Sequence, residues 1–192
     1  MINKERFKSF LRYSVFVYLV IIIIVGFSMH FTYDVIHKPK YSEQVNVFVG
    51  VFNIDNEKIE KKLYSGYEDS KIKVVNVDNA DYTDTYYPVV FTTRGLINTD
   101  ILIINLENIT DDDINSLFAP IDNISEIVSS EFEYYTKDDH KYGIKMNSYL
   151  RNYIHYDSKD YYLFINKNSD KMAKFTGEGT DDGLNALANI FK

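Results

Sequence analysis

The first strong pattern in the chain is a long, predominantly apolar run from Tyr13 to Phe31. Its first 17 residues contain no ionisable group apart from tyrosine, and four consecutive isoleucines, Ile21 to Ile24, lie within it. A helix of this length rises about 28 Å, close to the thickness of the hydrocarbon core of a bilayer. The pattern therefore predicts one transmembrane helix over residues 13–33.

A buried helix of a soluble domain and a cleaved signal peptide are the alternatives to a membrane span. A soluble core helix keeps a polar stripe, which this run lacks. A signal peptide has a shorter apolar region followed by a small-x-small cleavage site. The nearest such site, Gly26-Phe27-Ser28, follows an apolar stretch that is already full length. We therefore favour a retained membrane helix.

The two flanks of the apolar run differ in charge. Four basic residues precede it (Lys4, Arg6, Lys8 and Arg12), whereas the other flank opens with His30, Asp34 and His37. Basic residues remain on the cytoplasmic side of a membrane. We expect a single-pass protein of the cell membrane, with a cytoplasmic tail at 1–12, a juxtamembrane tether at 34–44 and an extracytoplasmic domain at 45–192.

The outer domain opens with a strand, a helix and a second strand. Residues 45–52 are mostly β-branched or aromatic, and either Asn53 or Asp55 can cap a helix whose apolar residues recur four apart. Residues 71–77 then give the second strand. Strand-helix-strand units of this size usually build a parallel sheet with a right-handed crossover.

A third strand and its following helix extend this α/β pattern. Residues 101–106 are almost continuously apolar, as in strands covered by helices on both faces. Thr110 and Asp113 have the spacing of a capping box, and Pro120 ends the helix that they begin. The sequence predicts a hairpin from 131–136 and 141–146, a strand at 161–166 and a final helix from about Asp181. Together these predict one three-layer-like α/β domain with a mainly parallel sheet.

Composition and charge narrow the functions open to this domain. The chain is 45% hydrophobic and contains no cysteine, which predicts a folded core and excludes disulfides and thiolate metal sites. Residues 1–40 contain six basic and two acidic residues, and the remaining 15 basic and 26 acidic residues give 41–192 a net charge of −11. Such a domain repels phosphate backbones, so we expect no nucleic-acid partner.

No motif for catalysis or metal binding is present in the sequence. The acidic groups at 111–113, 138–139 and 181–182 lack the calcium-loop pattern and fit helix caps or turns, although a cation site is the alternative. The four histidines have no zinc-ligand spacing, and there is no G-x-S-x-G elbow. We expect a non-enzymatic protein without metal or cofactor.

The best site candidates are polar residues expected near strand ends. Ligands of open α/β sheets collect at the carboxyl ends of the strands. We predict a binding site there, although Arg94 has the alternative role of an ion pair with a nearby aspartate. Tyrosine pairs such as Tyr86-Tyr87 fit either a ligand face or core packing. The ligand-binding candidates are Asn53, Thr92, Thr93, Arg94, Asn98 and Asn105.

Three stretches resemble the extracytoplasmic solute-binding domains of ABC importers, in their two-lobed type. They are VFVGV at 47–51, FTTRGLINTDILII at 91–104 and YYLFINKNS at 161–169. The resemblance covers about half of the outer domain. Only about 40 residues separate Pro120 from Tyr161, too few for a second lobe. The resemblance therefore implies a reduced, single-lobe periplasmic-binding-protein-like domain of a bacterial envelope.

These expectations lead to three classes of function. The first is a membrane-anchored binding or interaction module, accessory to a transporter or another envelope complex. The second is a ligand-sensing subunit that signals through its single helix, although a tail of about a dozen residues is too short to form an output domain. The third is an extracytoplasmic hydrolase or metal enzyme, which requires acids and a histidine to meet in one pocket.

Overall fold

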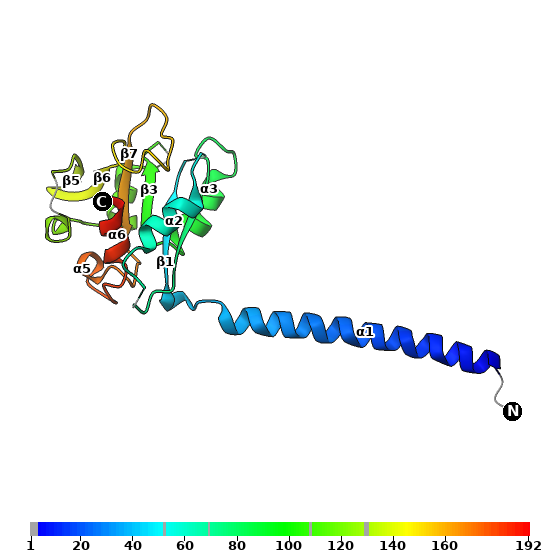
Figure 1. Cartoon of the computed structure of the whole chain (residues 1–192). Helices are drawn as coiled ribbons and strands as arrows, with labels where there is room; N and C mark the ends of the chain where they lie inside the picture. Colours follow the sequence, from blue (N-terminus) through cyan, green and yellow to red (C-terminus); the bar gives the residue numbers. More distant parts are fainter. Residues whose placement is uncertain (1–3, 52, 69, 108, 129–130) are drawn as a thin grey trace. The chain divides into compact units, whose positions relative to one another are not determined.

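The computed structural model describes residues 4–51, 53–68, 70–107, 109–128 and 131–192, and within the first helix the side chains of 13–33 and 35–37. The basic side chains that predict orientation and Phe52, the last residue of the first predicted strand, lie outside these described parts. The chain divides into two compact units, residues 1–40 and 41–192 (Figure 1).

The first unit is the helix α1, Lys4–His37. Its stretch from Tyr13 to His37 is long and apolar enough to cross a membrane once, and no described side chain in it is buried. The Thr32 hydroxyl donates to the Ser28 carbonyl at 2.7 Å, so its polar group is satisfied within the helix. Because α1 continues to His37, the first part of the expected tether is helical.

The second unit is built on a seven-stranded mixed sheet. Its order is β2-β1-β3-β7-β6-β5, with β4 paired to β7. The strands β2, β1 and β3 are parallel, and the others join antiparallel. The bounds are β1 Gln44–Val49, β2 Val74–Asn79, β3 Ile101–Asn105, β4 Phe118–Ala119, β5 Tyr134–Lys137, β6 His140–Lys145 and β7 Tyr161–Asn166.

The antiparallel direction of β7 follows from the loop that precedes it. The side chain of Asn147 accepts from the Tyr161 amide at 2.9 Å and donates to the Lys159 carbonyl at 2.6 Å. These bonds hold the start and the end of the loop 147–160 together. The chain therefore re-enters the sheet at the end where it left β6, and no crossover is made.

Short helices connect the strands. They are η1 Tyr41–Glu43, α2 Asn56–Tyr64, α3 Tyr87–Val90, the π-helical η2 Phe91–Leu96, α4 Asp111–Leu117, η3 Ile124–Glu126, α5 Ala173–Thr176 and α6 Leu184–Ile190. Two predicted caps are confirmed. The Asp55 side chain accepts from the Lys58 amide, and Thr110 and Asp113 form the capping box of α4.

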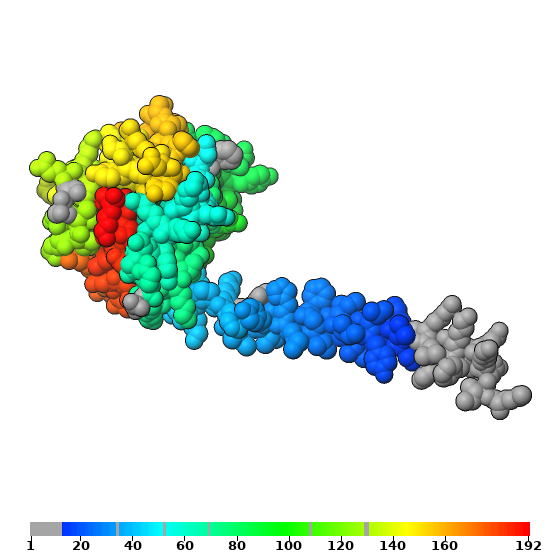
Figure 2. All heavy atoms as spheres, in the orientation of Figure 1, coloured from blue at the N-terminus to red at the C-terminus, as the bar shows by residue number. Residues whose placement is uncertain are grey.

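Helices cover both faces of the sheet. Val45, Val47 and Val49 face α2 and α6, which also pack against each other. Figure 2 shows the red C-terminal segment beside the cyan atoms of the α2 region. On the opposite face, Phe48 packs against Tyr87 and Phe91 of α3 and η2. The α/β class with helical layers on both faces is confirmed.

The edge strand β2 is partly closed by side chains of α2. The Val77 amide donates to Glu60 Oε1 at 2.9 Å, and Asn56 Nδ2 donates to the Val77 carbonyl at 3.1 Å. Both outward-facing backbone groups of Val77 are therefore satisfied. Of the tyrosine pair 86–87, Tyr87 is buried in the core and Tyr86 is exposed.

Candidate functional site

A polar cleft lies on one face of the sheet, at the amino ends of β1 and β2. Its volume is about 340 Å³, which suits a small ligand or one side chain of a partner. The strands form its floor, and the end of η2 forms one wall. This amino-end cleft is lined by Tyr41, Gln44, Asn46, Val47, Asn76, Asp78, Arg94, Asn98 and Thr99.

The floor of the amino-end cleft is a row of side-chain amides. Gln44 and Asn46 share a face by strand alternation, and the register places Asn76 beside Asn46. Asn76 Nδ2 donates to Gln44 Oε1 at 2.8 Å and to Asn46 Oδ1 at 2.9 Å. The bonds orient these amides. Within the described chain, Asn46 Nδ2 and Asn76 Oδ1 bond to no other group.

Arg94 and Asp78 form an ion pair at the rim of the cleft. The Arg94 Nη1 to Asp78 Oδ1 distance is 3.5 Å, and the two side chains are 61% and 47% exposed. This contact confirms the aspartate-paired alternative for Arg94. An exposed pair constrains its partners weakly, so the guanidinium can still meet a binding partner. A Cβ at Gly95 would lie 3.0 Å from Phe91 Cδ2, so glycine brings this wall close to the core.

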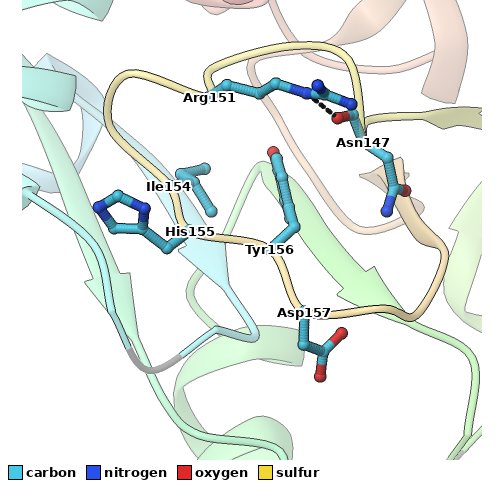
Figure 3. A pocket seen from close by; sticks show the side chains of 6 residues that line it. All are labelled: Asn147, Arg151, Ile154, His155, Tyr156 and Asp157. Carbon is cyan, nitrogen blue, oxygen red and sulfur yellow. Dashed lines mark hydrogen bonds between the residues drawn. The ribbon is translucent and has the colours of Figure 1, made fainter.

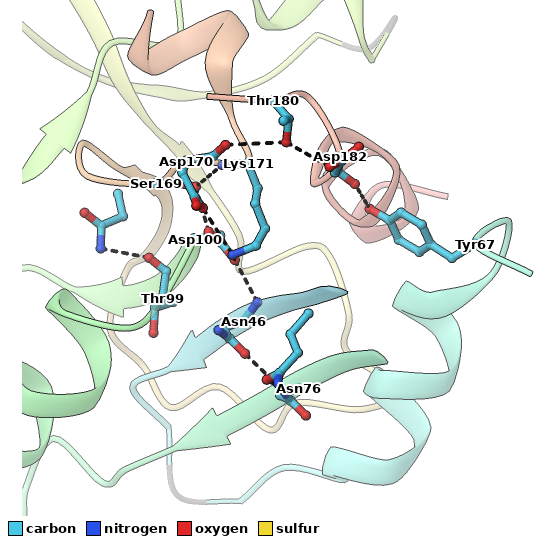
Figure 4. A network of polar contacts seen from close by, with 12 residues as sticks. Asn46, Tyr67, Asn76, Thr99, Asp100, Ser169, Asp170, Lys171, Thr180 and Asp182 are labelled. Carbon is cyan, nitrogen blue, oxygen red and sulfur yellow. Dashed lines mark hydrogen bonds and ion pairs between the residues drawn. The ribbon is translucent and has the colours of Figure 1, made fainter. Parts of the chain in front are cut away.

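A buried ion pair lies beside the amino end of β1 (Figure 4). The Lys171 Nζ atom is 3.6 Å from Asp100 Oδ2, and the two side chains are 2% and 0% exposed. Asp100 accepts from the Asn46 amide at 2.9 Å and from the Ser169 hydroxyl at 2.7 Å. Burial raises the pKa of Asp100, and Lys171 opposes that rise. The pair ties the start of β1 to the segment after β7.

Tyr41 connects this buried pair with the cleft. The Lys171 Nζ atom lies 3.8 Å from the centre of the Tyr41 ring, a cation–π contact. Burial raises the pKa of Tyr41, and the Asp100 charge raises it further. The ring also lines the amino-end cleft. A group that enters the cleft therefore contacts a tyrosine ring whose other contact is the buried Lys171 ammonium.

The structure does not bring the six predicted site residues together. Arg94 and Asn98 line the amino-end cleft. The hydroxyls of Thr92 and Thr93 instead donate to carbonyls one helical turn earlier, at 2.8 and 2.7 Å. Asn53 and Asn105 lie at the opposite end of the sheet. The expected convergence fails because residues 91–98 return the chain from the carboxyl end of β2 to the amino end of β3.

The carboxyl ends of β1 and β3 are covered by the loop 147–160. Ile154 forms an isolated antiparallel bridge with Ile54, and the His155 amide donates to the Asn53 carbonyl at 3.2 Å. Figure 2 shows the yellow atoms of this loop against the cyan segment after β1. Asn105 is buried beneath this end, where its Oδ1 accepts from the Glu107 amide at 3.1 Å.

The loop itself contains a second pocket, of about 300 Å³ (Figure 3). Arg151 Nε donates to the Asn147 carbonyl at 2.5 Å. The Tyr156 hydroxyl oxygen is enclosed and has no hydrogen-bond partner among the described residues. Asn53 lies in an adjoining hollow that also contains His155. This carboxyl-end pocket is lined by Asn147, Arg151, Ile154, His155, Tyr156 and Asp157.

No protein-family model matches the chain, and no curated protein or solved structure is significantly similar to it. Its function must therefore be inferred from α1 and from these two sites.

The acidic groups have structural roles in the described part of the chain. Asp113 caps α4, Asp138 and Asp139 form the hairpin turn with φ of 49° and 63°, and Asp181 accepts from the Lys174 amide at 2.8 Å. Over the described residues, no three His, Cys, Asp or Glu side chains cluster as metal ligands would. His140 is paired with Asp122 at 2.7 Å.

Sequence inspection missed Tyr41, Lys171 and the loop residues Arg151 and Tyr156. Tyr41 falls in the segment expected to be a tether, and Lys171 follows three polar residues that suggest a solvated turn. Their partners lie far away along the chain. For Arg151 one signal was present, because it is one of only two arginines in an acidic domain.

Proposed function

We propose that this protein is a single-pass, membrane-anchored binding module with its α/β domain outside the cytoplasm. The observation that supports the proposal is the apolar surface of α1, in which no described side chain from Tyr13 to His37 is buried. Such a surface is unfavourable in water and is stabilised in the hydrocarbon of a bilayer. The folded unit 41–192 is then the part presented at the membrane surface.

The charge distribution supports an extracytoplasmic domain in a bacterial envelope. Four basic residues precede the apolar run, and residues 41–192 have a net charge of −11. The anionic inner leaflet attracts the former and repels the latter. The proposal includes a reduced solute-binding-like lobe, for which the parallel strands β2, β1 and β3 between two helical layers give support.

The proposed partner is a transporter or another envelope complex that docks at the amino-end cleft. This cleft is open and polar, and Arg94 and Tyr41 at its rim are of the residue types that dominate binding energy at interfaces. The amides of its floor are already oriented, which reduces the entropy lost on binding.

A ligand-sensing subunit is the second candidate function, and the position of Tyr41 favours it. Only three residues, 38–40, separate the last residue of α1 from Tyr41. Because Tyr41 lines the cleft, a ligand that displaces its ring acts directly on the segment that leads to α1.

Purification of the tagged full-length protein from its native membrane in a mild detergent tests the proposal. Proteins that co-purify are identified and quantified by mass spectrometry. We expect the uncleaved chain in the membrane fraction and stoichiometric recovery of an envelope complex. Arg94→Ala should reduce that recovery by about tenfold, since it removes a rim contact without touching the core.

The matched control is Lys58→Ala, which removes another exposed positive charge, near the opposite end of the sheet, from a residue that lines neither the amino-end cleft nor the pocket of the loop 147–160. It should leave recovery of the complex unchanged. Recovery of the protein alone, or equal recovery with Arg94→Ala, would contradict docking at the amino-end cleft. A chain cleaved after Ser28 and released from the membrane would contradict anchoring.

A further inference from the structure

We propose that the carboxyl-end pocket binds a carboxylate group, with the Arg151 guanidinium as its charged anchor and the Tyr156 hydroxyl as a second donor. The site is separate from the amino-end cleft, and the proposal does not depend on docking there.

The first observation is the state of Arg151. Residues 41–192 contain 26 acidic residues and only two arginines, Arg94 and Arg151. Arg94 is paired with Asp78, whereas Arg151 is paired with no carboxylate of the described chain. Its one hydrogen bond there is from Nε to the Asn147 carbonyl. The terminal N–H groups remain free to bind a carboxylate in the forked geometry that guanidinium favours.

The second observation is the Tyr156 hydroxyl. Its oxygen is enclosed by protein and has no hydrogen-bond partner among the described residues. Buried hydroxyl groups are nearly always bonded, so an unpaired one marks the place of a missing acceptor. A tyrosine hydroxyl is protonated at neutral pH, and burial raises the pKa of Tyr156 further above its ordinary value, so the group can donate. In Figure 3 the hydroxyl points to the side of the pocket where Arg151 and Asn147 lie.

Hydrogen bonds and ring packing hold in place the loop that contains Arg151 and Tyr156. Asn147 bonds to the Lys159 carbonyl and the Tyr161 amide, and residues 153–155 are bonded to 53–55 by two backbone hydrogen bonds of 3.0 and 3.2 Å. The Tyr156 ring packs on that of Tyr161, with centroids 5.1 Å apart. The Arg151 side chain is exposed and is held to the loop by its bond to the Asn147 carbonyl, so the proposal requires it to turn toward the ligand.

The other ionisable groups of the pocket favour a singly charged carboxylate. These groups are His155 and Asp157. Asp157 accepts from the Tyr82 hydroxyl at 2.6 Å and from the Lys159 amide at 2.8 Å, so it is held in place, and its charge repels a dianion more strongly than a monoanion. Over the described residues no lysine lines the pocket to compensate a phosphate. One guanidinium and one hydroxyl match the two oxygens of a carboxylate.

This chemistry has two possible sources, a free small acid and the terminal carboxylate of a polypeptide. A pocket of about 300 Å³ accommodates either a small acid or the last residue of a chain. The test uses the full-length protein in lipid nanodiscs at low salt. Saturation-transfer NMR is recorded with propionate, with acetylated trialanine bearing a free carboxylate, and with the same peptide as its terminal amide. Inorganic phosphate serves as a competitor.

We expect propionate or the peptide acid to bind, and the peptide amide not to bind. Arg151→Gln should weaken binding by about tenfold or more, because it removes the charge and the fork while keeping most of the side-chain volume. Tyr156→Phe should weaken binding by about threefold or more without lowering the thermal unfolding midpoint. Lys58→Gln is the matched control: it removes an exposed positive charge that does not line the pocket, and it should bind as the wild type does.

Binding of propionate assigns the site to free acids, and binding of the peptide acid alone assigns it to a chain terminus. Both results support the proposal. It is overturned if no carboxylate binds, if the peptide amide binds equally, if Arg151→Gln binds as well as wild type, or if phosphate displaces propionate at a lower concentration than propionate itself requires. None of these results alters the outcome of the Arg94 purification experiment.

Discussion

The two ends of the sheet differ in how their polar groups are satisfied. At the amino end, Asp100 accepts two hydrogen bonds, and Asn166 Nδ2 donates to the Leu96 and Thr99 carbonyls at 2.7 and 2.8 Å. At the carboxyl end, the loop 147–160 leaves the Tyr156 hydroxyl without a partner among the described residues. The buried Lys171 Nζ at the amino end also lacks a hydrogen-bond partner among the described residues, but it faces the Asp100 carboxylate and the Tyr41 ring. The two ends therefore differ in that the enclosed donor of the carboxyl end, the Tyr156 hydroxyl, has no described acceptor or counter-charge beside it.

The carboxyl-end pocket also differs in position from the usual ligand site of an open α/β sheet. Open sheets of this class usually bind ligands directly at the carboxyl ends of their strands. Here the chain's own loop occupies that position, because Ile154 pairs with Ile54 just beyond β1. The candidate donors Arg151 and Tyr156 belong to the loop rather than to the strand ends. In the carboxylate-binding proposal, the ligand is therefore held by the loop that covers the strand ends and not by the strand ends themselves.

The largest effect is expected at the buried pair of the amino end. Lys171→Met leaves the Asp100 carboxylate buried without its counter-charge, which should lower the free energy of unfolding by about 3–5 kcal/mol. The measurement is urea unfolding of the full-length protein in detergent, followed by the near-ultraviolet circular dichroism of its tyrosines. Adding Asp100→Asn to Lys171→Met should recover part of the loss.

The control for this prediction is an exposed pair near the carboxyl end. Lys58 and Asp55 are 2.7 Å apart, but their side chains are 70% and 40% exposed. Lys58→Met should therefore leave stability nearly unchanged. Equal losses from Lys171→Met and Lys58→Met would remove the energetic contrast between the two ends.

A pair of tyrosine variants gives the next largest effect. The Tyr67 hydroxyl donates to the Asp182 carbonyl at 2.7 Å and accepts from the Ala186 amide at 2.9 Å, in the network of Figure 4. Tyr67→Phe leaves both groups unpaired and should lower the free energy of unfolding by about 1–3 kcal/mol. Tyr156→Phe removes a hydroxyl that has no described partner, so it should cause no loss.

The same urea unfolding experiment compares the two tyrosine variants. A loss for Tyr156→Phe as large as that for Tyr67→Phe would show that the Tyr156 hydroxyl is already satisfied. That result would remove the unpaired hydroxyl on which the proposed carboxylate site depends.

The smallest effect is expected at the exposed pair of His140 and Asp122. The hydrogen bond and charge of Asp122 raise the pKa of His140. Because the folded pKa lies above the unfolded value of about 6.5, the stabilisation is fully present below that pH and is lost as pH rises through the folded pKa. His140→Gln should destabilise the protein slightly at about pH 5.5 and not at about pH 9. A difference that is constant with pH would contradict this assignment.

The parts of the fold with local signals could be predicted from the sequence. The apolar run predicts α1, alternating or continuous apolar runs predict β1, β3 and β7, and capping residues mark the starts of α2 and α4. Each of these signals is complete within one segment of the chain. The hairpin of β5 and β6 and the final helix α6 were predicted for the same reason.

The sites could be predicted only in part, because their residues are joined by tertiary contacts. Arg94 and Asn98 were identified as polar residues, but the π-helical path of η2 decides which end of the sheet they reach. The burial of Lys171 depends on Asp100 and Tyr41, which are distant in sequence. The antiparallel entry of β7 depends on the side-chain bonds of Asn147.

The hydrogen bonds from α2 side chains to the edge strand β2 affect how neighbouring copies of the protein can interact. Copies of a chain anchored in one membrane, as proposed here, diffuse in two dimensions and meet each other's sheet edges often. An open edge strand would then recruit neighbours into a continuous sheet and aggregate. By occupying the outward groups of Val77, Glu60 and Asn56 block that extension part-way along β2. Helix α2 therefore limits edge-to-edge pairing of β2 between neighbouring molecules.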